Sequence, residues 1–410
     1  MRKLFSVLFF FLLTTPLFAQ QRYGFHLKGE TKRYSLPFEI KSNLIIVKAQ
    51  LNGFIPLNFI IDTGVRTTII TDITIADILG LKYQKKITLY GANRQPVNAY
   101  ISSGIQFASG KLMGNHLTIL VLDKDPLNFW SMTGTVVHGI LGYDLLSRFV
   151  TEIDYDRKMI TFHRIEDFQP PRKATSIPIS VDNTKIHIEG DVHLENRSFP
   201  KSQLMIDTGA STALTLEKDQ QHQLIAPPQK NIETHLGVGI SGMLNGWVGM
   251  VDSVSLSHTE IALDNVVSNF VDEQFFLDSA IVLQRNGTIG GEILSRFHLW
   301  IDYYHKEMYL KKSRKFNKPY KFDRSGLTLH LKNELSPKIY VEYIAAPSPA
   351  AKAGLQKGDQ ILSVNYFKGG EGQLGNINNL LQSRRKRKIK IKYKRGEETF
   401  KTTFYLEDLI

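Results

Sequence analysis

The sequence predicts a mainly β protein that consists of two homologous lobes and a small α+β module at its C-terminal end. The first observation is a repeated tripeptide, Asp-Thr-Gly, at residues 62–64 and 207–209. The second is a longer repeat, in which residues 139–149 resemble residues 287–297. The two offsets, 207 − 62 = 145 and 287 − 139 = 148, are nearly equal. Two motifs that recur in the same order, with nearly the same number of residues between their copies, indicate a duplicated lobe.

Each Asp-Thr-Gly copy follows an apolar segment that is typical of a buried strand, at residues 59–61 and 204–206. The pair Asn52-Gly53 predicts a hairpin turn before the first of these strands. Burying a carboxylate at the end of a strand costs free energy, so such a residue is expected to have a partner or a function. Asp62 and Asp207 are therefore the leading candidates for a functional site.

The rest of each lobe predicts short strands, short helices and a closing hairpin. These elements are strands at residues 44–47 and 176–181, helices at residues 76–81 and 144–149, and hairpins around residues 156–158 and 304–306. Adjacent prolines and charges at residues 166–173 predict a surface linker between the lobes. We place the lobes at residues 35–165 and 174–312.

The pattern changes after about residue 320, beyond a second linker at residues 311–319. The expected elements are strands at residues 326–331 and 339–344, a capped short helix, turn and strand within residues 348–365, and a helix at residues 376–382. Residues 389–394 alternate between basic and apolar side chains, which predicts a strand with one solvated face. We place this third module at residues 322–408.

Residues 1–19 predict a secretory signal peptide, because Arg2 and Lys3 precede an apolar run that ends near Ala19. The run is too short for an ordinary membrane span, and an uncleaved anchor is the alternative. We expect the mature chain to have no transmembrane span and to act in the periplasm or outside the cell. The absence of cysteine excludes disulfides, thiolate metal sites and a cysteine nucleophile.

The chain carries a formal charge of +12, and much of the excess lies at residues 311–315 and 384–388. A nucleic-acid site would interleave aromatic residues with basic ones on one surface. The second run instead continues into the alternating strand. We interpret both runs as solvated faces and expect no nucleic-acid partner.

The two candidate aspartates suit hydrolysis of an amide without a metal. One carboxylate can deprotonate a water molecule while a second, protonated carboxyl group donates to the carbonyl oxygen. The threonine of each copy can hydrogen-bond across the lobe interface, and the glycine lets the two backbones come close. These supporting residues are Thr63, Gly64, Thr208 and Gly209.

On these residues, the two lobes resemble retropepsin-like (pepsin-type) aspartic peptidases in a single-chain, duplicated form. The resemblance covers residues 35–312 and rests on two Asp-Thr-Gly copies, each with a Gly-apolar-apolar-Gly partner, at residues 139–142 and 287–290. It implies that Asp62 and Asp207 form the catalytic dyad and that no cofactor is needed. Arg66 departs from the small or acidic residue of the family, so we expect Asp62 to be the more readily ionised aspartate.

Peptidases of this kind cover the substrate with a β-hairpin flap. Candidate flaps are the glycine-bearing hairpins after each catalytic strand, with Tyr90 and Gly91 in the first lobe and Gly239 in the second. Mobile glycine hairpins suit a lid, and an ordinary hairpin turn is the alternative.

A metal site is the main rival to the dyad. His187, Glu189, Asp191 and His193 lie two residues apart on one expected strand, so they can share a face. An exposed polar strand face explains the same pattern more simply. We therefore expect no metal.

The third module resembles a PDZ domain over residues 322–408, through its Ser-Pro-Ala, Ala-Gly-Leu and Gly-Asp-x-Ile segments between residues 348 and 361. The resemblance implies that a peptide adds to a sheet edge and that backbone N–H groups hold its terminal carboxylate. Ser325, Gly326 and Leu327 would form that loop. Ser325 replaces the usual bulky apolar residue, and a docking module without a free-terminus ligand is the alternative.

These observations predict an exported aspartic endopeptidase that hydrolyses peptide bonds and carries a PDZ domain for peptide or substrate recognition. Its partners would be a peptide or protein substrate and a C-terminal peptide ligand. The alternative is a catalytically inactive peptidase fold that serves as a binding or scaffold protein of the envelope.

Overall fold

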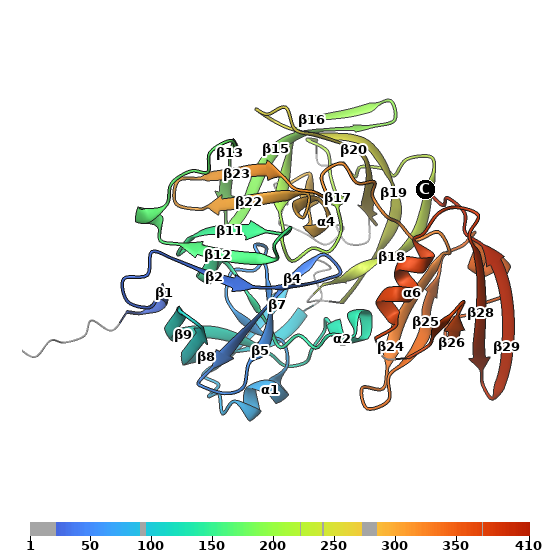
Figure 1. The fold of residues 1–410 in the computed structure, drawn as a ribbon, viewed down its shortest axis with the longest axis horizontal. Coiled ribbons are helices and arrows are strands. Elements are labelled where there is room, and N and C mark those ends of the chain that lie inside the picture. The colour runs from blue at the N-terminus through green and yellow to red at the C-terminus, as the bar shows by residue number, and fades with distance from the viewer. Residues whose placement is uncertain (1–21, 91–95, 222, 240–241, 273–284, 371) are drawn as a thin grey trace, which may run out of the picture.

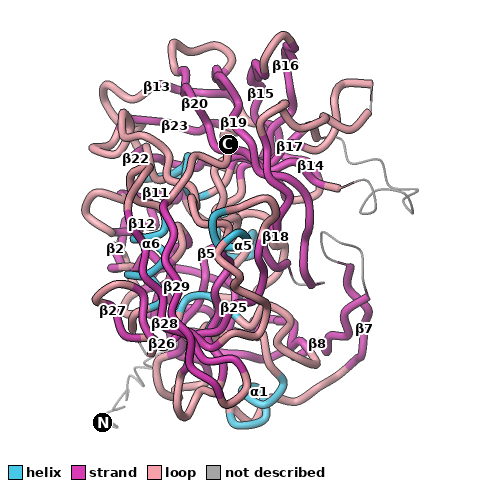
Figure 2. Tube along the Cα trace, turned by 90° about the vertical axis from the view of Figure 1, so that its right-hand side faces the viewer, coloured by secondary structure: helices cyan, strands magenta, loops and turns pink. Residues whose placement is uncertain are grey.

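The computed structural model describes residues 22–410 except residues 91–95, 222, 240–241, 273–284 and 371. The predicted signal peptide lies outside the described residues. Strands dominate the fold, and the helices are short (Figure 2). Two strand-rich lobes lie side by side, and the third module lies at one end of the pair (Figure 1). Among the described residues, no helix is long and apolar enough to cross a membrane.

The first lobe contains a nine-stranded sheet in the order β1-β9-β6-β10-β5-β4-β8-β7, with β3 paired to β4. Its strands are β1 (Gly24–Leu27), β3 (Glu39–Lys41), β4 (Leu44–Leu51), β5 (Leu57–Ile61), β6 (Ile69–Ile70), β7 (Lys85–Tyr90), β8 (Pro96–Ser109), β9 (Leu112–Leu122) and β10 (Gly139–Leu141). The Asn52-Gly53 turn joins β4 to β5, as predicted. Strand β5 runs parallel to β10, so the first tripeptide and the Gly-apolar-apolar-Gly segment leave the sheet together.

The second lobe repeats this design in an eight-stranded sheet, in the order β14-β15-β16-β21-β17-β20-β19-β18. Its strands are β14 (Ser180–Asp182), β15 (Lys185–Leu194), β16 (Arg197–Ile206), β17 (Leu214–Leu216), β18 (Asn231–Gly239), β19 (Gly242–Leu256), β20 (Ala262–Val271) and β21 (Gly287–Ile289). Here β16 and β21 are the parallel pair, which matches β5 and β10 in the first lobe.

A third, six-stranded sheet in the order β13-β23-β22-β11-β12-β2 takes strands from both lobes. Its strands are β2 (Arg33–Pro37), β11 (Val150–Asp154), β12 (Met159–His163), β13 (Thr175–Pro178), β22 (Phe297–Asp302) and β23 (Glu307–Lys312). Both predicted closing hairpins are present, as β11–β12 and β22–β23. Strands β11 and β22 pair antiparallel, with Ile153 opposite Leu299, so the lobes share one continuous sheet.

In the described part of the lobes, there are four short α-helices and one 3₁₀ turn: α1 (Ile73–Ile78), α2 (Phe129–Thr133), α3 (Tyr143–Leu146), α4 (Gly291–Leu294) and η1 (Ile165–Asp167). Helix α1 begins before the predicted residue 76, because the Asp72 side chain caps it by accepting from Thr74 N–H. Helix α3 ends at Leu146, before the predicted residue 149, because β11 begins at Val150.

The third module is a separate sheet, β24-β25-β26-β28-β29 with β27 paired to β26, covered by two helices. Its elements are β24 (Leu327–Lys332), β25 (Lys338–Ile344), α5 (Pro349–Lys352), β26 (Gln360–Val364), β27 (Phe367–Lys368), α6 (Leu374–Leu381), β28 (Lys388–Arg395) and β29 (Glu398–Tyr405). The alternating residues 389–394 form the predicted half-solvated strand, within β28. This module has its own buried apolar cluster, distinct from the large cluster that the two lobes share.

Candidate active site

The two parallel strand pairs bring the Asp-Thr-Gly loops to the interface between the lobes. The backbone N–H of Asp62 donates to Leu141 O at 3.0 Å, and that of Asp207 donates to Ile289 O at 2.9 Å. Each loop is thus fixed to its own Gly-apolar-apolar-Gly segment, as predicted. Gly142 and Gly290 must lack side chains here, because a Cβ would collide with the backbone carbonyls of Val65 and Thr212.

The threonines lock the loops together by reciprocal hydrogen bonds. Thr63 Oγ1 donates to Ile206 O at 2.7 Å, and Thr208 Oγ1 donates to Ile61 O at 2.8 Å. Each hydroxyl also accepts from the other threonine's N–H at 3.1 Å. Both threonines are buried, so these four bonds are shielded from water. The predicted hydrogen bonding across the lobe interface is confirmed.

The glycines allow the close approach of the two carboxyl groups. A Cβ on Gly64 would lie 3.0 Å from Asp207 Oδ2 and 3.1 Å from Asp62 Oδ1, which leaves it tight space between both aspartates. A Cβ on Gly209 would collide with the carboxyl group of Asp62. The predicted need for glycine is confirmed at Gly209, and at Gly64 the two carboxyl groups leave a side chain little room.

Backbone donors orient both carboxyl groups in the same way. Gly64 N–H donates to Asp62 Oδ1 at 2.6 Å, and Gly209 N–H donates to Asp207 Oδ1 at 2.8 Å. Both side chains remain partly accessible. Burial raises the pKa of Asp62 well above its ordinary value, and the neighbouring charge and hydrogen bond of Asp207 raise it further.

The expectation that Arg66 makes Asp62 the more readily ionised aspartate is wrong. Arg66 has an exposed side chain, whereas burial and the Asp207 charge dominate the pKa of Asp62. The cation that lowers this pKa, by a smaller amount, is Lys185 of the second lobe. Asp62 and Asp207 therefore form a coupled pair, in which burial and the charge of Asp207 favour the protonated form of Asp62.

Sequence reasoning missed a set of charges in the second lobe near Asp207. Lys185 starts β15, and its pKa is lowered by burial and by Arg285. Arg285 binds Glu217 through Nε at 3.0 and 3.1 Å and through Nη2 at 2.9 Å, and Glu217 is buried. Burial lowers the pKa of Arg285, and the charge and hydrogen bond of Glu217 more than offset this. The repeat does not mark the Arg285–Glu217 pair: Asp72 (217 − 145) is acidic like Glu217, but Val137 (285 − 148) stands where the second lobe has Arg285.

Both candidate flaps are hairpins. Tyr90 ends β7, is 69% exposed, and leads to the hairpin partner β8, while Gly91 lies outside the described residues. Gly239 ends β18 and pairs with Gly242 at the start of β19. The hairpins are therefore present, and their role as lids stays a prediction.

The rival metal residues lie on β15, where a register irregularity between Gly190 and Val192 interrupts the alternation. His187 is buried, whereas His193 is exposed, so the polar face is not uniform. In the part of the chain that the structure describes, no three His, Asp or Glu residues are grouped to hold a metal ion.

The loop predicted to hold a peptide carboxylate already has an internal acceptor. Ser325 N–H and Gly326 N–H donate to Asp323 Oδ2 at 2.9 and 2.5 Å, and Ser325 Oγ donates to Asp323 Oδ1 at 2.8 Å. Leu327 N–H donates to Ser325 Oγ at 3.1 Å. Burial raises the pKa of Asp323 to about 6. The sequence signal for this arrangement is the Asp-x-Ser-Gly spacing, because an aspartate readily accepts from N–H groups two and three residues onward.

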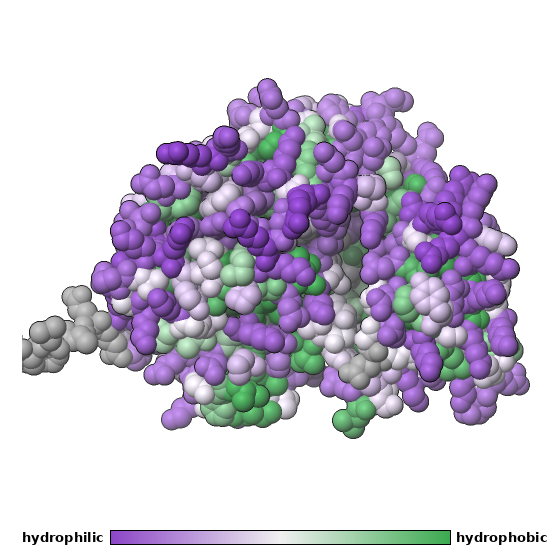
Figure 3. Space-filling model, viewed as in Figure 1, coloured by the Kyte–Doolittle hydropathy of each residue, from purple (hydrophilic) through white to green (hydrophobic). Residues whose placement is uncertain are grey.

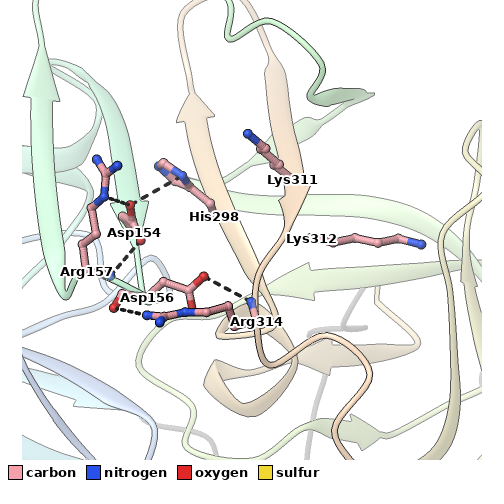
Figure 4. A pocket seen from close by; sticks show the side chains of 7 residues that line it. All are labelled: Asp154, Asp156, Arg157, His298, Lys311, Lys312 and Arg314. Carbon is pink, nitrogen blue, oxygen red and sulfur yellow. Dashed lines mark hydrogen bonds and ion pairs between the residues drawn. The ribbon is translucent and has the colours of Figure 1, made fainter.

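A shallow pocket of about 400 Å³ lies on the sheet that the lobes share, and no residue of the Asp-Thr-Gly loops lines it (Figure 4). Its lining residues are mostly charged: Asp154, Asp156, Arg157, His298, Lys311, Lys312 and Arg314. Arg157 pairs with Asp154 at 3.7 Å and Arg314 with Asp156 at 3.4 Å (Figure 4). These pairs compensate much of the pocket's charge, so it indicates no second active site.

The duplicated sheets and mirrored Asp-Thr-Gly loops define a protein of the aspartic-peptidase fold class, with a PDZ-like module. In agreement, residues 47–145 match the family model of aspartyl proteases, and residues 323–405 match that of PDZ domains. The resemblances predicted from the sequence are confirmed. No curated protein sequence matches the chain.

Solved structures that match the chain include basic 7S globulin from soybean, at 10% identity and a TM-score of 0.43 over 69% of this chain and 95% of that one. Another is an aspartic proteinase from Irpex lacteus, at 13% identity and a TM-score of 0.43 over 70% of this chain and 99% of that one.

Proposed function

We propose that this protein is an exported aspartic endopeptidase whose Asp62 and Asp207 activate a water molecule for attack on a peptide bond. The observation that carries the proposal is the placement of two partly accessible carboxyl groups on facing loops, each oriented by a glycine N–H and held by the threonine lock. Export rests on the signal-peptide pattern of residues 1–19.

In this proposal, each carboxyl group has its own role. Asp62, with its raised pKa, holds the shared proton and donates it to the carbonyl oxygen of the scissile bond. The ionised Asp207 takes a proton from the water, whose oxygen forms a bond to the carbonyl carbon. Collapse of the tetrahedral intermediate breaks the C–N bond, the proton on Asp207 passes to the leaving amine, and one hydroxyl proton of the intermediate returns to Asp62. The donors from Gly64 and Gly209 leave the Oδ2 atoms available for the water.

The substrate in this proposal is a peptide in extended form, which the hairpins β7–β8 and β18–β19 would cover. The second candidate is a peptidase-fold binding protein without catalysis. It is favoured by one observation, the unequal surroundings of the aspartates, since Lys185 acts on the pair from one lobe only.

Cleavage of a denatured protein separates the two candidates. We expect pepstatin-sensitive cleavage, and a loss of about 10³-fold or more in Asp62→Asn and in Asp207→Asn, since either change removes the acid–base pair. Thermal unfolding of both variants checks that they fold. If the wild-type chain cleaves nothing between acidic and neutral pH, the endopeptidase proposal is wrong and binding without catalysis is the function that remains.

A further inference from the structure

The free edge of the PDZ-like sheet faces the first lobe. Strand β24 pairs with β25 on one side only, so its other side is the edge at which a peptide would add. Helix α6 borders the same strand, and α2 of the first lobe packs beside it (Figure 1). The place of a ligand between β24 and α6 is thus adjacent to a segment of this chain.

Trp130 of α2 reaches into the module. Its side chain packs against the module's buried cluster, which includes Leu329 and Leu331 of β24 and Ile377 of α6. Gly134, just beyond the helix, also lies close to β24. A Cβ built on this glycine would lie 3.5 Å from Leu331 Cδ1. Trp130 therefore occupies the position at which an apolar ligand side chain would enter.

The same helix is anchored in the first lobe by its other face. Phe129 is buried against Leu44, Ile46 and Ile60, and Met132 packs against the same cluster. Helix α2 therefore lies between two apolar surfaces, one in each domain. This arrangement is a specific contact rather than a loose encounter of two surfaces.

The carboxylate end of the groove is filled as well. The N–H groups of residues 325–327 all donate within their own loop, two of them to Asp323. A peptide carboxylate would need those donors. Asp323 supplies a carboxylate of the required chemistry, and it is half-buried and accepts from Ser325 and Gly326 of that loop.

Other contacts hold the module in place. His235 of β18 stacks on Tyr343 of β25 with ring centroids 4.2 Å apart, and Lys230 Nζ donates to Ile410 O at 2.9 Å. The linker is tied to the second lobe by Arg296, which donates to Phe316 O at 2.9 Å and to Lys318 O at 2.5 Å. The module thus contacts both lobes, through α2 of the first lobe and β18 of the second.

We propose that the PDZ groove holds residues 129–134 of this chain as its resident ligand, with Asp323 in the place of a terminal carboxylate. A peptide with a free C-terminus then enters only in exchange for that segment. The module is primarily a dock for the first lobe, and an external peptide competes with the lobe. This goes beyond the proposed peptidase activity, which does not require it.

Peptide binding to the full chain tests the exchange. The probes are fluorescein-labelled octapeptides that end in each of the standard amino acids with a free carboxylate, and the same peptides amidated. All proteins carry Asp207→Asn, so cleavage cannot consume the probes and failure of the proposed activity does not affect the result. Fluorescence anisotropy gives Kd for the parent chain, Trp130→Ala, Asp323→Ala and the double variant. Tyr366→Ala, which truncates an exposed aromatic residue on the same module, is the matched control.

We expect weak binding to the parent and control chains, and binding at least about tenfold tighter to the double variant, since the apparent Kd is the Kd of the open groove divided by the fraction of grooves that are open. The gain should vanish with amidated probes. Equal Kd values for the parent chain and Trp130→Ala would overturn the proposal, and so would the absence of binding to every variant. If thermal unfolding shows that Asp323→Ala is not folded, the Kd of Trp130→Ala alone tests the proposal, because this variant leaves the loop of residues 323–327 intact.

Discussion

The two lobes present the same tripeptide on the same strands, yet their surroundings differ. The threonine lock and the glycine donors are symmetrical to within a few tenths of an ångström. Around this symmetrical centre, the second lobe adds Lys185 and the buried Arg285–Glu217 pair. Duplication has therefore kept the parts that meet at the interface, while the residues behind them have diverged.

The equivalent arginines Arg148 and Arg296 show the same divergence further out. Arg148 is exposed, whereas Arg296 is 1% exposed and lies 3.5 Å from the ring centroid of Tyr320. Arg296 also donates to backbone carbonyls of the linker that leads to the PDZ-like module. One position of the repeat is a surface residue in one lobe and a structural anchor in the other.

The largest effect is expected at the symmetrical centre, from Thr63→Ala and Thr208→Ala. Each change removes a buried hydroxyl that donates once and accepts once, so we expect a loss of about 3 kcal/mol in the free energy of unfolding. The two losses should agree within about 1 kcal/mol, because the bonds are reciprocal. Denaturant titration measures them, and Thr→Ser at each position is the control. A large difference between the two variants would show that the lock is not symmetrical.

A smaller, asymmetric effect is expected from Arg296→Ala against Arg148→Ala. Loss of the buried guanidinium leaves linker carbonyls without donors, which should cost about 2 kcal/mol. Arg148→Ala should change the free energy of unfolding by less than about 0.5 kcal/mol, because its side chain is exposed. Limited proteolysis at residues 313–320 should accelerate in the first variant only. Equal proteolysis would contradict the anchoring role of Arg296.

Acid should weaken the shared sheet through Glu152, which binds His163 at 2.7 Å and His298 of the other lobe at 2.8 Å. Although burial acts to raise its pKa, these partners lower the pKa of Glu152 to about 2. Its folded pKa lies below its unfolded one, so this stabilisation is present above the ordinary pKa and is lost as pH falls toward 2. With solvent screening, we expect about 1 kcal/mol. Thermal unfolding should lose less stability between pH 5 and 2 in Glu152→Gln than in the wild type.

The smallest effect is a shift of the pH profile of cleavage in Lys185→Met. Lys185 lowers the pKa of Asp62, so its removal raises that pKa and keeps the carboxyl group protonated to higher pH. The upper limb of the profile should move to higher pH. Arg66→Ala, which removes an exposed cation, should leave the limb in place. If Arg66→Ala shifted the upper limb instead, Arg66 and not Lys185 would be the cation that acts on Asp62.

In the two lobes, the features that could be predicted from the sequence were those that occur in both copies of the repeat. The offsets located both aspartates, both supporting segments and the closing hairpins, because homologous positions carry matching residues. Lys185 and the Arg285–Glu217 pair could not be predicted, since Val137 stands at the position equivalent to Arg285 and the charges come together only through tertiary packing.

The same limit explains the error at Arg66. Proximity in sequence to Asp62 suggested an electrostatic partner, but the Arg66 side chain is exposed, and burial and the Asp207 charge dominate the pKa of Asp62. The PDZ-like fold was predicted from local signatures. Its contact with Trp130 was not, because nothing in the local pattern of either segment refers to the other.

The shared sheet also imposes an order on folding. Strand β11 has an unpaired edge until β22 reaches it, and Ile153 and Leu299, which face each other there, are separated by 146 residues (299 − 153). Such distant pairing is slow, because a long loop must close before the contact forms. A chain that stops after the first lobe would expose that edge to other chains and tend to aggregate. Protection of the β11 edge against misassembly therefore requires the second lobe, because β22 covers that edge.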